Sequence, residues 1–390
     1  MMRKIFILSV ISLANLTFAQ TFIQAYQNRA DQILQTNITA NLQDFGNLGI
    51  KTTGSANNTS ALNWIKDKYL SYGYSAGQMV EDPFTYNSTT SKNLIITKTG
   101  TVYPNTYVII CGHYDTINGP GVNDNGSGTS IILEAARILK DVPTEYSIKF
   151  IHFSGEEQGL VGSSHYANNV AYQGSTRMLD IRLVFNLDQV GGKLGNTNNT
   201  IKCERDNGGQ TGNNATSNTM TQQLATCTTL YSPLQTAITS AYSSDYMPFE
   251  NKNEIITGFY ENVQSPHPHT SSDTFANVDP TYVFNVGKAA VGALQHFAVA
   301  ATSILDTKDI TSNKLESIKV YPNPAKDILN VEIPERSKDF NIEITDMSGR
   351  SLLNVENQEK IDISGLANGT YMCIIRLNDE SVTRKIIIEK

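Results

Sequence analysis

The middle of the chain alternates short, continuously apolar runs with stretches of helical spacing. The apolar runs are residues 93–97, 107–111, 148–153 and 181–187, and a helical pattern at 130–140 separates the second from the third. Continuous apolar strands joined through helices are typical of a parallel sheet that is buried on both faces. We therefore expect an α/β domain with a mixed, largely parallel central sheet covered by helices on both faces. Functional groups should follow the carboxyl ends of its strands.

The length of 390 residues favours two folded units. A helical stretch at 280–302 closes the first unit, which we place at residues 20–303, and a polar linker is expected at 304–316. From residue 317 to 390 the pattern changes to short alternating runs broken by turns such as Ser348-Gly349 and Asn368-Gly369. This pattern predicts a small all-β sandwich.

The first 19 residues have the pattern of a secretory signal peptide. Arg3 and Lys4 precede an apolar run, and Ala19 offers a small residue for cleavage. A membrane anchor is the alternative, but the run is shorter than the ~20 residues that a span needs. No later stretch is apolar enough to span, so we expect no membrane span in the mature protein.

Several further features limit the partners and the covalent structure. The net charge of −7 is diffuse, without a basic stripe, so nucleic acid is not an expected partner. Four cysteines are too few for a disulfide scaffold, and whether Cys203 and Cys227 pair is open.

Residues 21–73 predict two helices, with Ser60 able to cap the start of one, and part of residues 20–90 could be an inhibitory pro-segment. The Asn/Thr-rich residues 196–221 are expected to be a surface loop or insertion.

The first group with metal-binding chemistry follows the run at 107–111. His113 leaves the end of a predicted strand, where its imidazole could bind a metal, and Asp115 lies two residues further on the same side of an extended chain. Asp115 could then orient His113 through a hydrogen bond to the ring. A His and an Asp at this spacing are also common without a metal.

Asp124 lies in the glycine-rich stretch Gly121–Gly128, just before the predicted helix. The glycines permit a tight loop that would aim the carboxylate inward as a ligand shared by two metals. The alternative is a plain turn in which Asp124 caps the helix. A phosphate-binding loop is disfavoured because no lysine follows the final glycine.

The adjacent carboxylates Glu156 and Glu157 come directly after the apolar run at 148–153. Adjacent side chains diverge, so one could bind a metal while the other accepts a proton from the attacking water. Asp188 follows the run at 181–187 in the same way, and His269 is a further candidate ligand. His152, His165 and His296 are predicted to be structural, and His267 a non-ligand.

The strings at 112–116, 121–128, 154–159, 186–191 and 269–274 resemble, in order, those of the secreted bacterial leucyl-aminopeptidase family of co-catalytic zinc peptidases. The resemblance covers nearly all of residues 21–303. It implies two zinc ions per chain. The first would be bound by His113, Asp124 and Asp188, and the second by Asp124, Glu157 and His269. It further implies Glu156 as general base and proton shuttle and Asp115 as the support of His113.

The sequence also departs from this family. Tyr246 stands in Ser244–Phe249 where many relatives carry a histidine after the Ser-Asp pair. Tyr242 could donate to the substrate carbonyl or could simply pack as an aromatic residue.

The tail resembles the C-terminal sorting domain of the Bacteroidetes type IX (Por) secretion system through the strings at 320–324, 346–350 and 366–371. The resemblance implies contact with the secretion machinery and a secreted or cell-surface protein. A substrate-binding β-module is the alternative for this domain.

Together these features predict a secreted metallo-aminopeptidase that acts on peptides or proteins with free N-termini. The alternatives within the fold are a single-zinc glutaminyl cyclase and a catalytically inactive scaffold. The complete set of ligands for two metals speaks against the cyclase, and the retention of Glu156 together with all five predicted ligands speaks against the scaffold. A serine hydrolase is disfavoured because no Gly-x-Ser-x-Gly elbow accompanies the candidate histidines.

Overall fold

The computed structural model describes residues 20–302, 318–333, 340–346, 350–377 and 380–390. The chain divides into two compact units, residues 1–303 and 304–390. The predicted signal peptide at 1–19, the predicted linker at 304–316 and the predicted turn Ser348-Gly349 lie outside the described residues.

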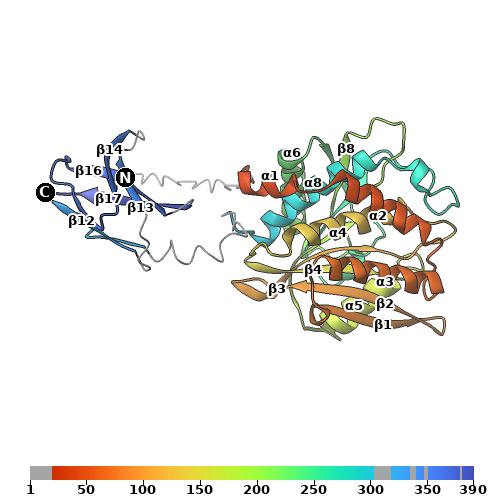
Figure 1. The fold of residues 1–390 in the computed structure, drawn as a ribbon. Helices are drawn as coiled ribbons and strands as arrows, with labels where there is room; N and C mark the ends of the chain where they lie inside the picture. Colours follow the sequence, from red (N-terminus) through yellow and green to blue (C-terminus); the bar gives the residue numbers. More distant parts are fainter. Residues whose placement is uncertain (1–19, 303–317, 334–339, 347–349, 378–379) are drawn as a thin grey trace, which may run out of the picture. The chain divides into compact units, whose positions relative to one another are not determined.

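The larger unit is built on an eight-stranded mixed sheet (Figure 1). Its strands in chain order are β1 (Met79–Tyr86), β2 (Thr89–Lys98), β3 (Tyr103–His113), β4 (Tyr146–Phe153), β7 (Asp180–Leu187), β8 (Thr200–Arg205), β9 (Gln235–Ser240) and β10 (Ile256–Glu261). They are arranged in the order β1-β2-β4-β3-β7-β10-β8-β9. The four central strands β4, β3, β7 and β10 run parallel, whereas β1, β2 and β8 join through antiparallel pairs. The expected mixed, largely parallel sheet is confirmed.

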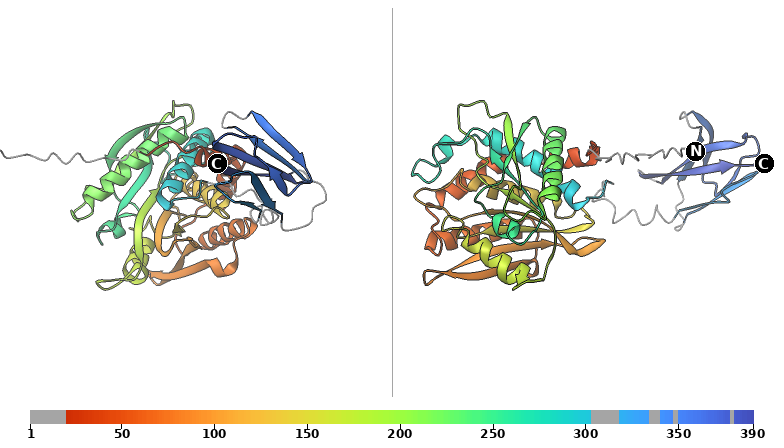
Figure 2. Two further views of the ribbon diagram at one scale, coloured as in Figure 1. Left: turned by 90° about the vertical axis from the view of Figure 1, so that its left-hand side faces the viewer. Right: turned by 180° about the vertical axis from the view of Figure 1, so that it is seen from behind.

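Helices cover both faces of this sheet, as expected (Figure 2). One face carries α1 (Gln24–Ala30), α2 (Gln35–Asn47), α3 (Ala56–Ser71), α4 (Gly126–Leu139), α6 (Asn214–Tyr231) and α8 (Pro280–Ala298). The other face carries α5 (Val161–Tyr166), the π-helical turn at Ala167–Ala171 and α7 (Met247–Glu250). Successive residues of β3 alternate between the two cores: Val108 and Ile110 face the first, Ile109 and Cys111 the second. This two-sided burial explains why the central strands are apolar throughout.

Smaller elements complete the larger unit. They are the short helices η1 (Ala76–Gln78) and η3 (Phe275–Asn277) and the strands β5 (Tyr172–Gln173) and β6 (Thr176–Arg177), which pair with each other. Within the described residues, no helix has the length and apolar character needed to cross a membrane.

Two local predictions were wrong. Residues 21–73 form three helices, and Ser55 caps α3 by accepting a hydrogen bond from the Asn58 N–H, so Ser60 lies inside that helix. Residues 196–221 contain β8 and the first half of α6 instead of a surface loop. The buried face of α6 is partly polar, because Ser217 and Thr221 occupy inward positions, and this hid its helical periodicity. Cys203 and Cys227, whose pairing was open, are buried free thiols.

The smaller unit is all-β and antiparallel. One sheet has the order β11 (Lys319–Tyr321), β12 (Ile328–Glu332), β15 (Lys360–Asp362), and the other β14 (Ser351–Glu356), β13 (Phe340–Thr345), β16 (Gly369–Leu377), β17 (Glu380–Ile388). Leu329 and Val331 of the first sheet share one apolar core with Ile342 and Ile375 of the second. The small β-sandwich is therefore confirmed.

Candidate metal centre

The predicted site residues gather at the carboxyl edge of the central sheet. His113 ends β3, Glu156 and Glu157 follow β4, and Asp188 follows β7. Because these three strands are parallel neighbours, their carboxyl ends lie side by side. Asp124 comes from the loop between β3 and α4 and His269 from the loop between β10 and α8.

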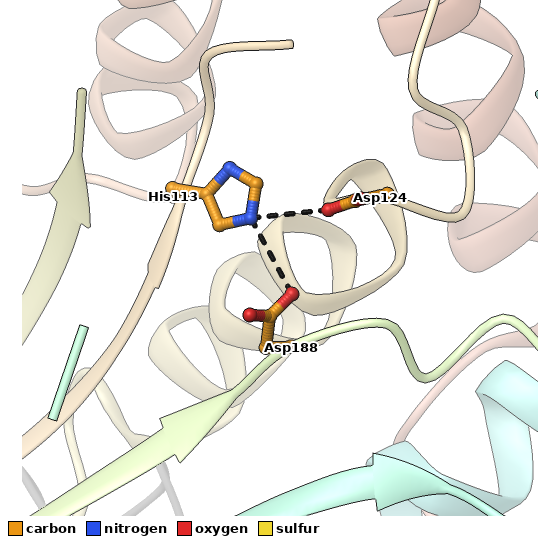
Figure 3. A group of neighbouring side chains, drawn as sticks. All are labelled: His113, Asp124 and Asp188. Carbon is orange, nitrogen blue, oxygen red and sulfur yellow. Dashed lines mark hydrogen bonds and ion pairs between the residues drawn. The ribbon is translucent and has the colours of Figure 1, made fainter. Parts of the chain in front are cut away.

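A first triplet consists of His113, Asp124 and Asp188 (Figure 3). The Nε2 atom of His113 lies 3.2 Å from Oδ1 of Asp124 and 3.4 Å from Oδ1 of Asp188. All three side chains are buried. Their donor atoms therefore converge on one enclosed point.

A second triplet consists of Asp124, Glu157 and His269. The Nε2 atom of His269 lies 3.0 Å from Oδ2 of Asp124 and 2.9 Å from Oε2 of Glu157. The His269 side chain is 51% exposed, so this triplet is the more open one. Asp124 thus directs one carboxylate oxygen toward each histidine.

The alternative in which Asp124 caps α4 is wrong. Asn125 is the capping residue, because its side chain accepts a hydrogen bond from the Gly128 N–H. The peptide bond between Asp124 and Asn125 is cis. Asp124 is left to face the two histidines.

Asp115 supports the adjacent glutamates more directly than it supports His113. Its carboxylate accepts hydrogen bonds from the main-chain N–H groups of Glu156 and Glu157, both at 3.2 Å. The Nδ1 atom of His113 lies 3.1 Å from the main-chain oxygen of Asp115 and 3.7 Å from its carboxylate. Thr53 of the N-terminal segment donates to the same carboxylate at 3.2 Å.

Three further residues hold the predicted ligands and were missed by sequence reasoning. Asp273 accepts hydrogen bonds from the N–H groups of Asn123 (2.8 Å) and Asp124 (3.0 Å). The hydroxyl of Ser244 donates to Oδ2 of Asp188 at 2.6 Å. The amide of Gln189 donates to Oδ2 of Asp124 at 2.9 Å. All three residues lie in the strings 186–191, Ser244–Phe249 and 269–274 of the family resemblance, but no local pattern marks their roles.

Burial and the closeness of several carboxylates shift the pKa values of the acidic side chains at this site. Burial and the neighbouring acids Asp188 and Asp245 raise the pKa of Glu156 to about 10. Burial and Asp124 raise the pKa of Glu157 to about 8. Burial alone would also raise the pKa of Asp124, but hydrogen bonds from His113 and His269 lower it to about 2.

These observations fit bound metal cations. A cation would favour the ionised forms that burial and mutual repulsion now oppose. The buried Oε1 atom of Glu157 has no hydrogen-bond partner, as expected for an atom that faces a ligand. Imidazole and carboxylate together are the donor set that zinc binds in catalytic sites.

The remaining histidines lie outside both triplets. The ring of His152 is within hydrogen-bonding distance of the Tyr69 hydroxyl, and that of His296 of the Tyr231 hydroxyl. His165 contacts Asp82, and His267 contacts Ser272.

The two tyrosines at the departure from the family pattern make distinct contacts. The Tyr246 hydroxyl donates to the buried carboxylate of Glu204 at 2.9 Å and accepts from the Tyr242 N–H at 2.9 Å. Tyr242 is 43% exposed, and its ring packs edge-on against that of Tyr260.

The sheet is mixed and largely parallel, and its carboxyl edge carries two histidine–carboxylate triplets around one shared aspartate. These features place the chain in the class of α/β proteins with a site of the metallohydrolase type. The chain belongs to peptidase family M28, whose family model matches residues 93–294. Residues 319–389 match the model of a secretion system C-terminal sorting domain.

The chain is similar to several curated proteins over part of its length. It is 44% identical to aminopeptidase YwaD of Bacillus subtilis (strain 168) over 108 residues, which are 27% of this chain and 23% of that protein. The matches to eight curated relatives span 18% to 38% of the lengths of those relatives.

Two solved structures show the same fold. The LapA aminopeptidase of Legionella pneumophila has a TM-score of 0.62 and 20% identity, covering 76% of this chain and 80% of that one. A glutaminyl cyclase of Bacteroides thetaiotaomicron, solved with N-acetylhistamine bound, has a TM-score of 0.55 and 17% identity, covering 67% and 97%. A protein named as an aminopeptidase and a protein named as a glutaminyl cyclase thus share this fold. The fold alone therefore does not identify the reaction.

Proposed function

We propose that this chain is an exported metallo-aminopeptidase with two zinc ions per chain, which removes N-terminal residues from peptides or proteins. The observation that carries the proposal is the position of Asp124. Its two oxygens lie 3.2 Å and 3.0 Å from the ring nitrogens of two different histidines, each of which has a second carboxylate beside it. One carboxylate shared between two triplets would hold two metal ions close together, as in the sites of two-metal hydrolases.

In this proposal His113, Asp124 and Asp188 hold one zinc, and Asp124, Glu157 and His269 hold the other. Bound zinc would polarise the scissile carbonyl, lower the pKa of the attacking water and stabilise the developing oxyanion. Family membership and the aminopeptidase relatives support the reaction class.

Glu156 is the proposed general base. Its main chain is held by Asp115, and its carboxylate lies close enough to His113 and Asp188 to interact electrostatically with both. The carboxylate of Glu156 takes a proton from the attacking water as the new C–O bond forms. It then delivers this proton to the leaving amine nitrogen as the C–N bond breaks.

Export of the protein is part of the proposal. The match of residues 319–389 to a sorting-domain model and the predicted signal peptide at 1–19 support it. We infer that the β-sandwich engages a secretion machinery and that the catalytic unit works outside the cell or at its surface.

The test combines metal analysis with turnover of chromogenic aminoacyl substrates by the wild type and Glu156→Gln. We expect about two zinc ions per wild-type chain, loss of hydrolysis with a chelator, and recovery with added zinc. Glu156→Gln should retain its zinc but lose about 10²–10⁴-fold in kcat, the usual contribution of general acid–base catalysis. Glu145→Gln, at a partly exposed position outside both triplets, is the matched control and should behave like the wild type.

Other outcomes would redirect the proposal. One zinc per chain with cyclisation of N-terminal glutamine would replace it with the cyclase activity. A folded wild-type protein that binds no zinc and turns over no aminoacyl substrate would show an inactive scaffold.

A further inference from the structure

Lys51 is a fully buried lysine beside the loop that leads to Asp124. Its ammonium donates to three main-chain carbonyl oxygens, those of Phe45 (3.1 Å), Gly49 (2.7 Å) and Pro120 (2.7 Å). A lysine ammonium has three N–H donors, so each is used. The first two acceptors belong to the end of α2 and the segment after it, whereas Pro120 belongs to the loop between His113 and Asp124.

The main chain of Lys51 is joined to the same loop. Its N–H donates to the Thr116 hydroxyl at 2.9 Å, and its carbonyl accepts from the Thr116 N–H at 3.2 Å. The segment around Lys51 therefore contacts the loop both near its start and close to Asp124.

The end of α2 also packs tightly against residues on both sides of Asp124. A Cβ atom on Gly46 would lie 2.8 Å from Cγ2 of Val122, and one on Gly126 would lie 2.6 Å from Cδ1 of Phe45. Such close approach leaves little room for the loop to shift while α2 stays in place.

We propose that Lys51 is a positioning residue of the metal centre, whose ammonium ties the end of α2 to the Pro120 carbonyl and so holds Asp124 between His113 and His269. The inference rests on the proposed function and extends the metal site to the N-terminal helices. Without the ammonium, three carbonyl oxygens lose their donor, of which that of Phe45 is in a buried hydrogen bond and those of Gly49 and Pro120 are in partly buried ones. The loop would then gain freedom to move, and the spacing of the two triplets would change with it.

The burial of a charge at this position is costly, which argues that it serves a purpose beyond packing. Burial lowers the pKa of Lys51 to about 7, while the nearby carboxylate of Asp273 opposes that effect. Asp273 is also the residue that holds the Asp124 N–H. Lys51 and Asp273 thus act on the same loop from two sides.

The test compares Lys51→Met with Lys98→Met in the full-length protein. Lys98 is a matched control because it is also buried, but its ammonium donates to the Thr144 hydroxyl and it pairs with Ile148 at the opposite edge of the sheet. Zinc affinity is measured by competition with a chromogenic chelator, and ligand geometry by the visible spectrum of the cobalt-loaded protein.

We expect Lys51→Met to bind zinc about 10–100-fold more weakly, the usual effect of removing a group that supports metal ligands, and to show an altered cobalt spectrum. Lys98→Met should keep the wild-type affinity and spectrum. A folded Lys51→Met protein with wild-type zinc affinity and spectrum would overturn the inference while leaving the proposed function intact. A wild type that binds no zinc would overturn both.

A second measurement on the wild type covers the case in which Lys51→Met does not fold. Zinc binding should slow amide hydrogen exchange in residues 45–53 as well as in 113–125, because the coupling between the two segments is reciprocal. Residues 89–98 serve as the internal control. Protection of 113–125 without any change at 45–53 would refute the link.

Discussion

Replacing Asp273 with asparagine removes a negative charge and one acceptor oxygen from the support of Asp124 while the side chain keeps its size. The carboxylate uses its two oxygens to accept the N–H groups of Asn123 and Asp124, at 2.8 Å and 3.0 Å. An asparagine has the same size but only one acceptor oxygen, so one of these buried N–H groups must face an amide NH₂. The change therefore tests support of Asp124 without creating a cavity.

The size of the effect follows from the lost interaction. A hydrogen bond to a charged group contributes about 1.5–3 kcal/mol. If most of this loss falls on the position of Asp124, zinc binding weakens by about 10–100-fold, since each factor of ten corresponds to about 1.4 kcal/mol. That range agrees with the usual cost of removing a group that holds a metal ligand.

The assay is thermal or denaturant unfolding of Asp273→Asn with and without zinc, together with chelator competition. Stabilisation by a bound metal depends on the ratio of its free concentration to its dissociation constant, so the zinc-induced shift should shrink in the variant. Asp279→Asn is the matched control, because Asp279 also accepts two main-chain N–H groups, from Thr281 and Tyr282 at the start of α8. Equal zinc-induced shifts in Asp273→Asn and the wild type would refute the reasoning.

Two further predictions concern the support of Asp188 and the buried ring of His152. Ser244→Ala removes the 2.6 Å hydrogen bond to Asp188 and should weaken zinc binding about tenfold in the same competition assay; unchanged affinity would show that this hydroxyl does not support the ligand. Burial lowers the pKa of His152 from 6.5 to about 3, so below pH 6.5 the unfolded chain binds this proton and the folded protein does not. The neutral ring therefore contributes its full share of the folding stability above pH 6.5, and this share decreases as the pH falls. At pH 5 the decrease is about 2 kcal/mol, because each pH unit below 6.5 corresponds to about 1.4 kcal/mol. Urea unfolding at pH 7 and pH 5 should show that acidification is about 2 kcal/mol less favourable for the stability of the wild type than for that of His152→Gln, because the other titrating groups are common to both proteins. The same change in both proteins would contradict this role of His152.

The sequence was most informative where burial is two-sided. The strands β3, β4 and β7 were predictable because both of their faces are covered, which makes them continuously apolar. β9 was not predictable, because its residues are exposed or only partly buried and carry no such pattern. The polar inward face of α6 hid that helix for a similar reason.

The three candidate ligands at strand ends, His113, Glu157 and Asp188, could be predicted from the local sequence, whereas the residues that support the candidate ligands could not. At the end of each of these strands, the sequence changes abruptly from apolar to polar residues, and this change marks the position of the candidate ligand. Asp273, by contrast, lies 149 residues from the N–H of Asp124 that it holds, and Thr53 lies 62 residues from Asp115. Such pairs arise only when distant loops meet, so no spacing in the chain reveals them.

The unequal exposure of the two triplets has a consequence for how the protein would acquire and lose its metals. His113, Asp124 and Asp188 are all buried, whereas the side chain of His269 is half open to solvent. An ion held by the buried set can leave only after its neighbour or its loops have moved, while an ion at the open set can exchange directly with solvent. We therefore expect a chelator to empty the His269 side first, so that a protein with half its metal is one defined species and not a random mixture.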